Sequence, residues 1–424
     1  MGSDLSEKSH VIVIGAGVVG LCTADELLSR GFGVTIVERD EIPGEGCSYG
    51  NGGLIVPSHF EPLAQPGMIA MGLRMLANPR SPFAIHGLGS AEVLSWVTQF
   101  ALAANAKHVE KCAPVLRDLN LLSRDIYSTT YCEIAQNAGF QHQGELMICR
   151  TEKKLDGEKH LAEKAAKLGM KTRMLSKSDL RTEEPDCDID AVGAVYFEDD
   201  AKLSPTAFMT GLRNRVIDRG AKVMDGVEVT GFNTEGKRVA GIDTSEGEIQ
   251  ADSFVLASGS WSAGLARKLG LKVPILAGKG YGFTVPNPPQ TPRLPALLIE
   301  GRLAVTPMID GLRFVGTMEL GKPTSTSIND ARVEGMRRSV AEYYPAFREV
   351  DLKSLKVWCG LRPCPPDGMP YIGRTARFDN LIFATGHGMM GMSLGPISGR
   401  LIGEVLANEP CSVPLELLSP DRYA

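Results

Sequence analysis

The first part of the chain alternates between apolar runs and helical periodicity. Residues 11–14 (VIVI) are apolar at every position, which is typical of a strand buried on both faces within a parallel sheet. A helical pattern with its apolar residues on one face follows at 21–28, and a second apolar run at 34–37 ends at Glu38. This order of strand, helix and strand predicts a parallel β–α–β unit.

Similar patterns recur along the rest of the chain. Apolar strands are predicted at 252–261 and 381–386, and helices at 206–219 and 391–407. Short β-rich runs bounded by Gly, Pro and Asp predict the strands of a second sheet, and they read QGELMICR, VGAVYF, GYGFTV, RLAVTPM and LRFVGTM. The helices expected to pack on this sheet are 91–106, 152–168 and 329–343.

Glycines separate the first predicted strand from its helix in the pattern G-x-G-x-x-G. Gly15 suits a tight turn, Gly17 lets the backbone approach a pyrophosphate, and Gly20 allows close packing of helix and strand. Glu38, at the end of the next strand, is expected to bind the hydroxyls of an adenosine ribose. The complete order of strand, glycines, helix, strand and acid predicts a dinucleotide site, without separating NAD from FAD.

A second glycine-rich loop favours FAD. Residues 44–54 (GEGCSYGNGGL) are too long and polar for a structural turn and suit a backbone wrapped around an extended pyrophosphate and flavin, with a plain loop as the alternative. Residues 386–391 (GHGMMG) repeat the glycine spacing and open a helix. Because no further strand and acid follow, we interpret them as a helix N-terminus directed at the flavin ring, whose reduced form carries negative charge.

Composition excludes some classes of function. The 424 residues suffice for two domains, and 43% hydrophobic with 22% charged residues is ordinary for a soluble globular protein. A net charge of -5 without a basic run argues against a nucleic-acid partner. No run of 18 apolar residues occurs, so no transmembrane segment is expected.

The N-terminus and the cysteines point to a reducing compartment. The sequence MGSDLSEKSH is polar and lacks the apolar core of a signal peptide, although its first six residues formally fit a myristoylation pattern. The nine cysteines are scattered without a CxxC pair, which predicts reduced thiols and no metal site. The expected location is cytoplasmic.

Five stretches resemble the FAD-dependent amine and amino-acid oxidoreductases of the D-amino-acid oxidase superfamily. They read VIVIGAGVVG, SYGNGGLI, KGYGFTV, GLRPCPPDGMPYIG and ATGHGMMGMSLGP. The resemblance is strongest to bacterial D-amino acid dehydrogenases of the small-subunit type, and weaker to glycine oxidase and sarcosine oxidase. It implies an α/β fold in which a Rossmann-like FAD-binding domain (8–60, 203–272 and 352–412) is interrupted by an α+β substrate domain (61–202 and 273–351) with a mainly antiparallel sheet.

The resemblance also implies an activity, the FAD-dependent oxidative deamination of D-amino acids to 2-oxo acids and ammonia. Hydride passes from Cα to flavin N5, and the electrons then pass to an acceptor other than oxygen, such as quinone or another carrier. A close alternative is an oxidase or dehydrogenase of D-proline, D-hydroxyproline, glycine or sarcosine, because pocket volume and not a motif separates these substrates. A different class is a redox flavoprotein without turnover, but such a protein needs no carboxylate anchor, so the arginine of GLRP argues against it. An NAD-linked dehydrogenase is disfavoured because the chain lacks a second complete nucleotide-binding unit.

The residues expected to contact FAD come from all parts of the interrupted domain. They are Gly15, Gly17, Val18, Val19, Gly20, Glu38, Arg39, Ser48, Asn51, Gly52, Gly53, Leu54, Val229, Ala257, Gly259, Trp261, Gly360, Gly386, Gly388, Met389, Met390, Gly391 and Met392. In related sarcosine oxidases a cysteine tethers the flavin, and the matching position here is Gly360, so FAD is predicted to bind non-covalently.

Arg362, within GLRP, is the predicted anchor of the substrate carboxylate. A planar guanidinium binds a carboxylate through two hydrogen bonds, although an ion pair with Asp367 is the alternative role. Arg302 and Arg313 are the next candidates for this anchor. Tyr281 is expected to cover the pocket and donate a hydrogen bond to the carboxylate, or to be a plain sheet tyrosine.

Two histidines and two methionines complete the predicted pocket. His387 is expected to tune the flavin or bind the substrate amine, with a backbone-capping histidine as the alternative, and His59 is a further candidate. Met389 and Met390 are expected to present backbone to the flavin and side chains to the pocket floor, unless they fill the core.

Residues 66–79 (PGMIAMGLRMLANP) are rich in Met and Leu and carry a single charge. One interpretation is a peripheral contact with the inner face of the membrane, through which electrons reach quinone. The other is an amphipathic helix that packs on the substrate domain.

Overall fold

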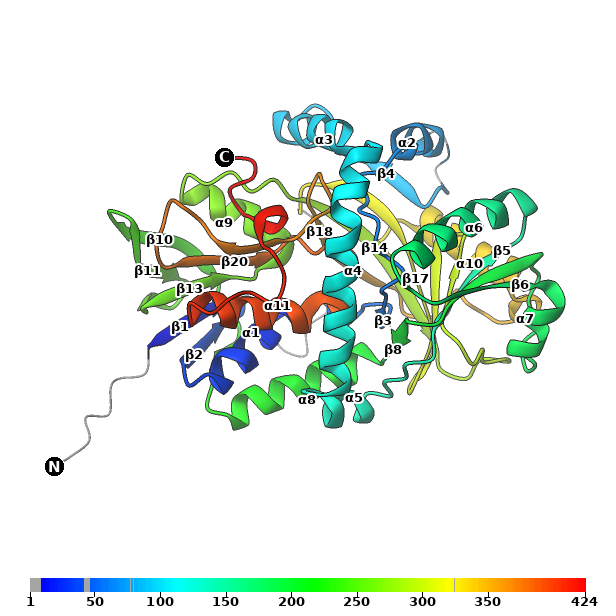
Figure 1. Cartoon of the computed structure of the whole chain (residues 1–424), viewed down its shortest axis with the longest axis horizontal. Coiled ribbons are helices and arrows are strands. Elements are labelled where there is room, and N and C mark those ends of the chain that lie inside the picture. Colours follow the sequence, from blue (N-terminus) through cyan, green and yellow to red (C-terminus); the bar gives the residue numbers. More distant parts are fainter. Residues whose placement is uncertain (1–8, 42–45, 77, 79, 324) are drawn as a thin grey trace.

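Within the residues that the structure describes (9–41, 46–76, 78, 80–323 and 325–424), two large sheets lie side by side with helices around them (Figure 1). The structure is a computed structural model. The first sheet has the strand order β19 (Tyr371–Arg374), β20 (Leu381–Thr385), β13 (Ser253–Leu256), β1 (His10–Ile14), β2 (Gly33–Val37), β9 (Lys222–Met224). Neighbours are parallel except β19 and β20, and the apolar run of β1 is buried at its centre as predicted.

The second sheet is mainly antiparallel. Its order is β18 (Trp358–Cys364), β14 (Leu276–Val285), β17 (Gly311–Gly321), β16 (Leu303–Met308), β15 (Ala296–Leu298), β5 (Glu145–Cys149), β7 (Gly193–Phe197), β6 (Thr172–Ser176), with β4 (Phe83–Ile85) also paired to β17. The pairs β15–β5 and β17–β4 are parallel. Together the two sheets confirm the predicted α/β fold with a mainly antiparallel second sheet.

Two small sheets and several outer helices surround the two large sheets. Two small sheets consist of β10 (Val229–Glu235), β11 (Arg238–Thr244) and β12 (Gly247–Gln250), and of β3 (Leu54–Ile55) and β8 (Ala201–Lys202). The outer helices are α2 (Met68–Leu76), α3 (Ala91–Ala103), α6 (Glu152–Lys167), α7 (Lys177–Glu183), α9 (Ser262–Lys268) and α10 (Asp330–Tyr343). Of these, α3, α6 and α10 lie where helices were predicted.

Two helices from opposite ends of the chain pack tightly against each other beside the first sheet. They are α1 (Val18–Ser29) and α11 (Gly391–Leu406), and glycines of α11 face α1. A Cβ at Gly399 would lie 2.5 Å from the carbonyl oxygen of Cys22, so a larger residue would force the helices apart. Gly395 lies against Val18 and Gly403 against Arg30, which shows that the two helices run parallel and begin at the same edge.

A long helix that the sequence patterns did not predict, α4 (Ala106–Ser128), stands between the two halves of the molecule (Figure 1). It shares the core of the first sheet with α5 (Cys132–Asn137) and α8 (Pro205–Asp218). The Tyr127 hydroxyl donates to the Met392 carbonyl at 2.6 Å, and the Ile397 amide donates to Ser123 Oγ at 3.3 Å. This helix therefore holds the start of α11.

The predicted segmentation of the chain differs from these contacts in two places. Residues 106–128 were placed with the substrate domain, whereas they pack into the core of the first sheet. Residues 358–364 were placed with the FAD-binding domain, whereas as β18 they pair with β14 in the second sheet. Both segments thus connect the two halves.

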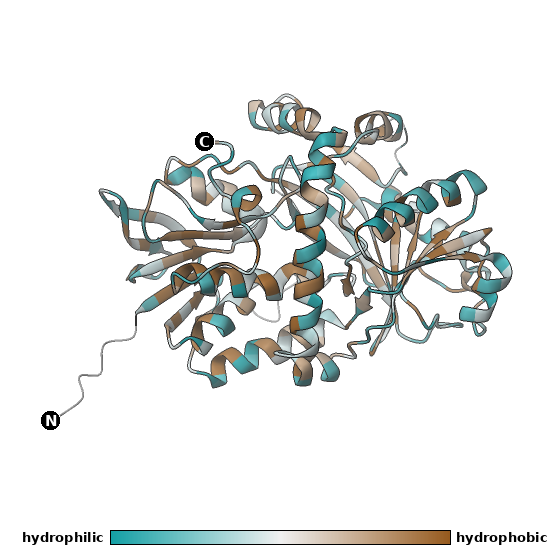
Figure 2. Cartoon of the chain, viewed as in Figure 1, coloured by the Kyte–Doolittle hydropathy of each residue, from teal (hydrophilic) through white to brown (hydrophobic). Residues whose placement is uncertain are grey.

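Hydropathy follows this arrangement. Figure 2 shows α11 as mostly brown and the outer helix α6 as mostly teal, in keeping with an inner and an outer position. Among the described helices, none combines the length and the hydropathy that crossing a bilayer requires. All nine cysteines are free thiols.

Candidate functional site

A cavity of about 2050 Å³ extends from the edge of the first sheet to the face of the second. Its first end is lined by the loops that follow β1, β2 and β13, and its other end by β17, β18, α2 and α6. Because β1, β2 and β13 are parallel, their carboxyl ends meet at this edge, which is where ligands bind in such sheets.

The glycines after β1 have the geometry that a dinucleotide requires. Gly15 has a φ of +111°, and a Cβ there would lie 2.7 Å from the Ala257 carbonyl oxygen. A Cβ at Gly20 would lie 1.9 Å from the Gly15 carbonyl oxygen, so Gly20 lets α1 pack against the turn as predicted. Gly17 lines the cavity at the N-terminus of α1, where backbone amides favour an anion.

The loop after β2 fits the adenosine end of the ligand. The Glu38 carboxylate accepts hydrogen bonds from the amides of Ala16 at 2.6 Å and Asp40 at 3.0 Å, which fix it at the end of the strand. The Arg39 guanidinium carbon lies 4.1 Å from the centre of the Trp261 ring. The Glu38 carboxylate can accept hydrogen bonds from the ribose hydroxyls, and the flat groups of Arg39 and Trp261 can stack on a base. This is the arrangement expected for an adenosine site.

The second glycine-rich loop is held in place by side-chain contacts. Ser48 Oγ accepts a hydrogen bond from the Val18 amide at 2.9 Å, at the start of α1. Arg313 donates to the carbonyls of Tyr49 at 3.2 Å and Asn51 at 3.1 Å. Gly44 and Glu45, which belong to the predicted loop, lie outside the described residues.

The N-terminus of α11 reaches the cavity beside that of α1. A Cβ at Gly391 would lie 4.0 Å from Val18, and residues 388–392 line the cavity. Two parallel helix dipoles therefore present their positive ends to the same space. This arrangement suits a group that carries or develops negative charge, and the donors present fit FAD.

Most residues predicted to contact FAD line this one cavity. They are Gly15, Gly17, Val18, Val19, Glu38, Arg39, Ser48, Asn51, Gly52, Leu54, Val229, Ala257, Gly259, Trp261, Gly360, Gly388, Met389, Met390, Gly391 and Met392. Gly20, Gly53 and Gly386 lie behind it and serve packing, since a Cβ at Gly53 would lie 2.1 Å from the Leu203 carbonyl oxygen and one at Gly386 would lie 2.8 Å from the Tyr371 ring.

Arg362, on β18, also lines the cavity. Its guanidinium donates to the carbonyls of Thr317 at 2.6 Å and Gly316 at 3.4 Å, and burial lowers its pKa. Among the described residues, no carboxylate lies within ion-pair distance of it. Asp367, the alternative partner, is instead paired with Arg422 at 2.6 Å. Arg362 is thus a half-buried cation with room for an anion.

The strand β14 and an irregularity of β17 position this arginine. A Cβ at Gly280 would lie 2.0 Å from Arg362 Nη1, so the glycine lets the guanidinium cross β14. The β14–β17 register shifts between Lys279 and Tyr281, and Thr317 has a φ of +65°. The Thr317 hydroxyl is buried without a hydrogen-bond partner among the described residues and lines the cavity. Together these groups offer donors to a carboxylate.

Tyr281 does not cover the pocket, and that prediction is wrong. Its side chain is fully buried in the core of the second sheet, and its hydroxyl donates to Glu319 at 2.5 Å and accepts from the Asn329 amide at 3.1 Å. Neighbouring residues of a strand point to opposite faces, so when Gly280 faces Arg362, Tyr281 faces away. The plain sheet tyrosine is the role that the structure supports.

The two other candidate arginines have different positions. Arg313 does not line the cavity and organises the glycine-rich loop as described above, so it is not a substrate anchor. Arg302 lies in the turn between β15 and β16 and lines the cavity.

The two predicted histidines are neutral. His387 Nε2 donates to Ser398 Oγ at 2.8 Å, since that hydroxyl itself donates to the Leu394 carbonyl, and burial lowers the pKa of His387 to about 3. Its ring thus fastens the loop to a side chain of α11 and not to a backbone group, and His387 also lines the cavity. His59 lines the cavity 3.1 Å from Ser58 Oγ, and burial lowers its pKa to about 4.

Comparison with known proteins agrees with this geometry. The model of the family described as FAD dependent oxidoreductase matches residues 10–405. A D-amino acid dehydrogenase of Granulibacter bethesdensis is 30% identical over 98% of this chain and 100% of its own length. A D-amino-acid oxidase of Bradyrhizobium diazoefficiens is 30% identical over 99% of this chain and 100% of its own length.

Solved structures share the fold at lower identity. Glycine oxidase from Geobacillus kaustophilus has a TM-score of 0.75 and 21% identity, covering 99% of this chain and 100% of that chain. L-Proline dehydrogenase from P. horikoshii has a TM-score of 0.76 and 21% identity, covering 99% of this chain and 98% of that chain. The family model and the relatives at 30% identity show that the chain belongs to the FAD-dependent oxidoreductase family.

The position of Arg362 generates a first prediction. Arg362→Ala removes the guanidinium, and Gly280→Ala displaces it, so each is expected to raise KM for a D-amino acid by roughly tenfold or more while the flavin stays bound. Steady-state kinetics and the flavin absorbance of the purified variants measure this. Gly321→Ala, in the same sheet with 3.5 Å to its nearest neighbour, is the control. An unchanged KM in Arg362→Ala would remove the anchor.

The depressed pKa of His387 generates a second prediction. Because its folded pKa of about 3 lies below the usual 6.5, the unfolded chain binds the extra proton, and stability falls as the pH falls below 6.5. His387→Gln is expected to flatten this fall, by at most about 1.4 kcal/mol per pH unit. Urea unfolding between about pH 7.5 and about pH 5 measures this change in stability, with the exposed His160→Gln as control. Parallel curves for His387→Gln and the native chain would contradict it.

Proposed function

We propose that this member of the FAD-dependent oxidoreductase family oxidatively deaminates D-amino acids and passes the electrons to an acceptor other than oxygen. The observation that carries the proposal is the pairing of a dinucleotide site with Arg362 in one cavity. Arg362 has no carboxylate partner among the described residues, so an amino acid's carboxylate completes its environment. The named dehydrogenase and oxidase relatives support the choice of D-amino acids.

The residues of the chain serve mainly to position the substrate. Arg362 and the Thr317 hydroxyl hold the α-carboxylate and thereby orient Cα. FAD held in this cavity would supply the acceptor for the hydride of Cα. The positive ends of α1 and α11 stabilise negative charge at the cofactor, and water completes the reaction by hydrolysing the imino acid. Gly360 stands where a tethering cysteine would be, in keeping with non-covalent FAD.

A second candidate uses oxygen as the acceptor. It is favoured by the relative from Bradyrhizobium diazoefficiens that is named D-amino-acid oxidase, which is as similar to this chain as the dehydrogenase. Glycine, sarcosine, D-proline and D-hydroxyproline remain alternative substrates for the same carboxylate anchor.

Anaerobic flavin bleaching tests the proposal. The purified yellow protein is mixed with D- and L-amino acids, glycine, sarcosine and both series of proline, and the flavin absorbance is followed. Bleaching by D-amino acids is expected, with slow recovery of the colour in air and fast recovery with a quinone analogue. Fast recovery in air supports the oxidase. If no compound bleaches the flavin, the proposed reaction is wrong.

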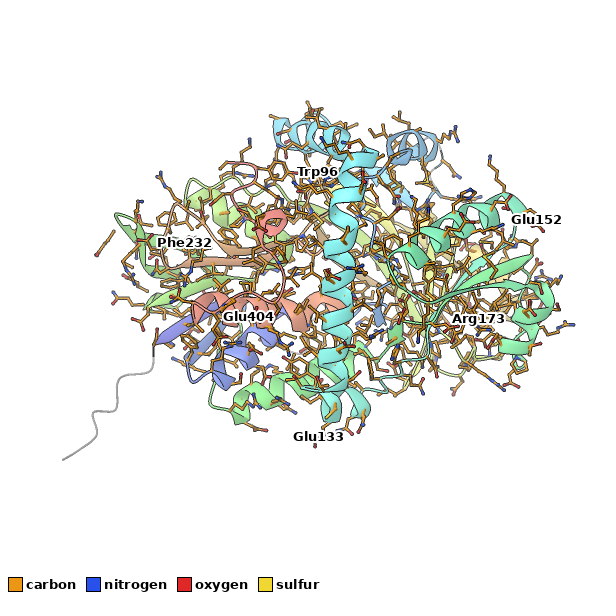
Figure 3. All side chains as sticks on the ribbon, in the orientation of Figure 1. Trp96, Glu133, Glu152, Arg173, Phe232 and Glu404 are labelled. Atoms are coloured by element: carbon orange, nitrogen blue, oxygen red, sulfur yellow. The ribbon has the colours of Figure 1, made fainter. Side chains whose placement is uncertain are left out.

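We further propose that α2 and the neighbouring end of α3 contact a membrane surface where quinone accepts the electrons. The two helices project from the same edge of the molecule in Figure 1, and α2 buries none of its residues. Leu73 is 64% exposed and Leu102 is 74% exposed, and Arg74 adds a positive charge. Trp96, labelled in Figure 3, ties α3 to β18 by donating to the Cys364 carbonyl at 2.9 Å.

Sedimentation with vesicles of phosphatidylethanolamine and phosphatidylglycerol tests this contact. The native chain is expected to sediment with the vesicles, and Leu73→Glu to stay in the supernatant because a carboxylate resists transfer into the lipid interface. Ile217→Glu, at an exposed position of α8, is the matched control. If all three proteins sediment equally, or if the native chain does not sediment with the vesicles, the membrane contact is contradicted. Neither outcome bears on the proposed reaction.

A further inference from the structure

Arg302 is a second cation in the cavity whose charge lacks an anionic partner. Among the described residues, no carboxylate lies within ion-pair distance of it, and its guanidinium donates to the sulfur of Met71 at 2.6 Å. A thioether is a weak acceptor, so it does not satisfy a guanidinium. The Arg302 side chain is exposed to the open cavity, and the surrounding protein lowers its pKa.

The backbone places Arg302 close to the carboxylate anchor. Leu303, the next residue, pairs with Gly316, and the Gly316 carbonyl accepts from Arg362. Arg302 precedes β16, a neighbour of β17, whereas Arg362 starts from β18 and crosses β14 at Gly280 to reach the other side of β17. Neighbouring strands are about 5 Å apart. Arg302 has a φ of +49°, a conformation in which arginine is uncommon. The turn thus holds a charged side chain where asparagine or glycine would be usual.

Cations outnumber anions among the described residues that line this wall, which are Arg302, Lys153, Lys154, Lys164, Glu61 and Glu158, and Glu300 adds a negative charge nearby. Glu158 of α6 attracts Arg302 from beyond ion-pair distance, and Lys154, one turn earlier on the same helix, offsets that carboxylate. Lys164 is already paired with Glu61 at 2.7 Å. The apolar residues that line the cavity near this wall are Met147, Leu161, Leu297 and Ile299. A short aliphatic chain that ends in an anion would match this combination.

We propose that Arg302 binds the side-chain carboxylate of an acidic D-amino acid whose α-carboxylate is held by Arg362. The substrate class is therefore the dicarboxylic D-amino acids, D-glutamate and D-aspartate. This inference rests on the proposed function, because it assumes that Arg362 holds the α-carboxylate.

Kinetics with D-glutamate and its neutral isostere D-glutamine test the role of Arg302. Arg302→Asn removes the charge and suits the left-handed turn, so it is expected to raise KM for D-glutamate roughly tenfold or more while KM for D-glutamine changes less than about twofold. Arg302→Lys keeps the charge and is expected to restore part of the difference. Arg348→Asn, at an exposed position outside the cavity, is the matched control.

A binding measurement separates this inference from the proposed reaction. The flavin absorbance of the oxidised holoenzyme is titrated with glutarate and with the monocarboxylate valerate. Arg302→Asn is expected to lower the affinity for glutarate and leave that for valerate unchanged. Glu158→Gln is expected to raise the affinity for glutarate, because it removes the competing carboxylate. If D-glutamine reduces the flavin but Arg302→Asn leaves KM for D-glutamate and the glutarate affinity unchanged, the inference is overturned and the proposed function stands.

Two other outcomes are decisive as well. If no amino acid reduces the flavin, the proposed function fails. A selective loss of glutarate binding in Arg302→Asn would then still support an anion site at Arg302. If D-lysine is preferred over D-glutamate and Glu158→Gln abolishes that preference, Glu158 and not Arg302 selects the substrate, and the inference is overturned.

Discussion

The contact between α1 and α11 is the constraint on which the cofactor end of the cavity depends. Glycine at position 399 lets the helices touch at backbone distance, and that approach sets the N-termini of both helices at one edge of the first sheet. Parallel dipoles placed side by side repel each other. The tight packing and the hold of α4 on Met392 compensate for this repulsion, and a bound anion relieves it.

The substrate end depends in a comparable way on one irregularity of a sheet. A regular β17 would direct its carbonyls into the ladder, whereas the shifted register and the left-handed Thr317 turn two of them towards Arg362. Backbone carbonyls orient the guanidinium without neutralising it. A carboxylate partner such as Glu319, which holds Tyr281, would have filled the anion's place. The charge is therefore fixed in position and still available.

Local patterns predicted the cofactor end better than the substrate end. Residues 11–38 form a β–α–β unit whose glycines and acid are neighbours in sequence, so periodicity and spacing were sufficient. Tyr281 was misplaced because which residues of a strand face the cavity depends on its partners, and Thr317 was missed because a bulge leaves no local signal. The helix α4 was missed although its length is 23 residues, since Pro114 interrupts its helical pattern.

The position of α11 has a consequence for how the protein is made. Residues 388–392 form one wall of the cofactor cavity, far along the chain from the β–α–β unit that forms the other. Because the N-terminal β–α–β unit is synthesised before α11, the cavity that it opens lacks one wall until α11 has packed against α1. Until then the glycine turn after β1 is exposed, so the cofactor cavity is complete only after segments far apart in the sequence have met.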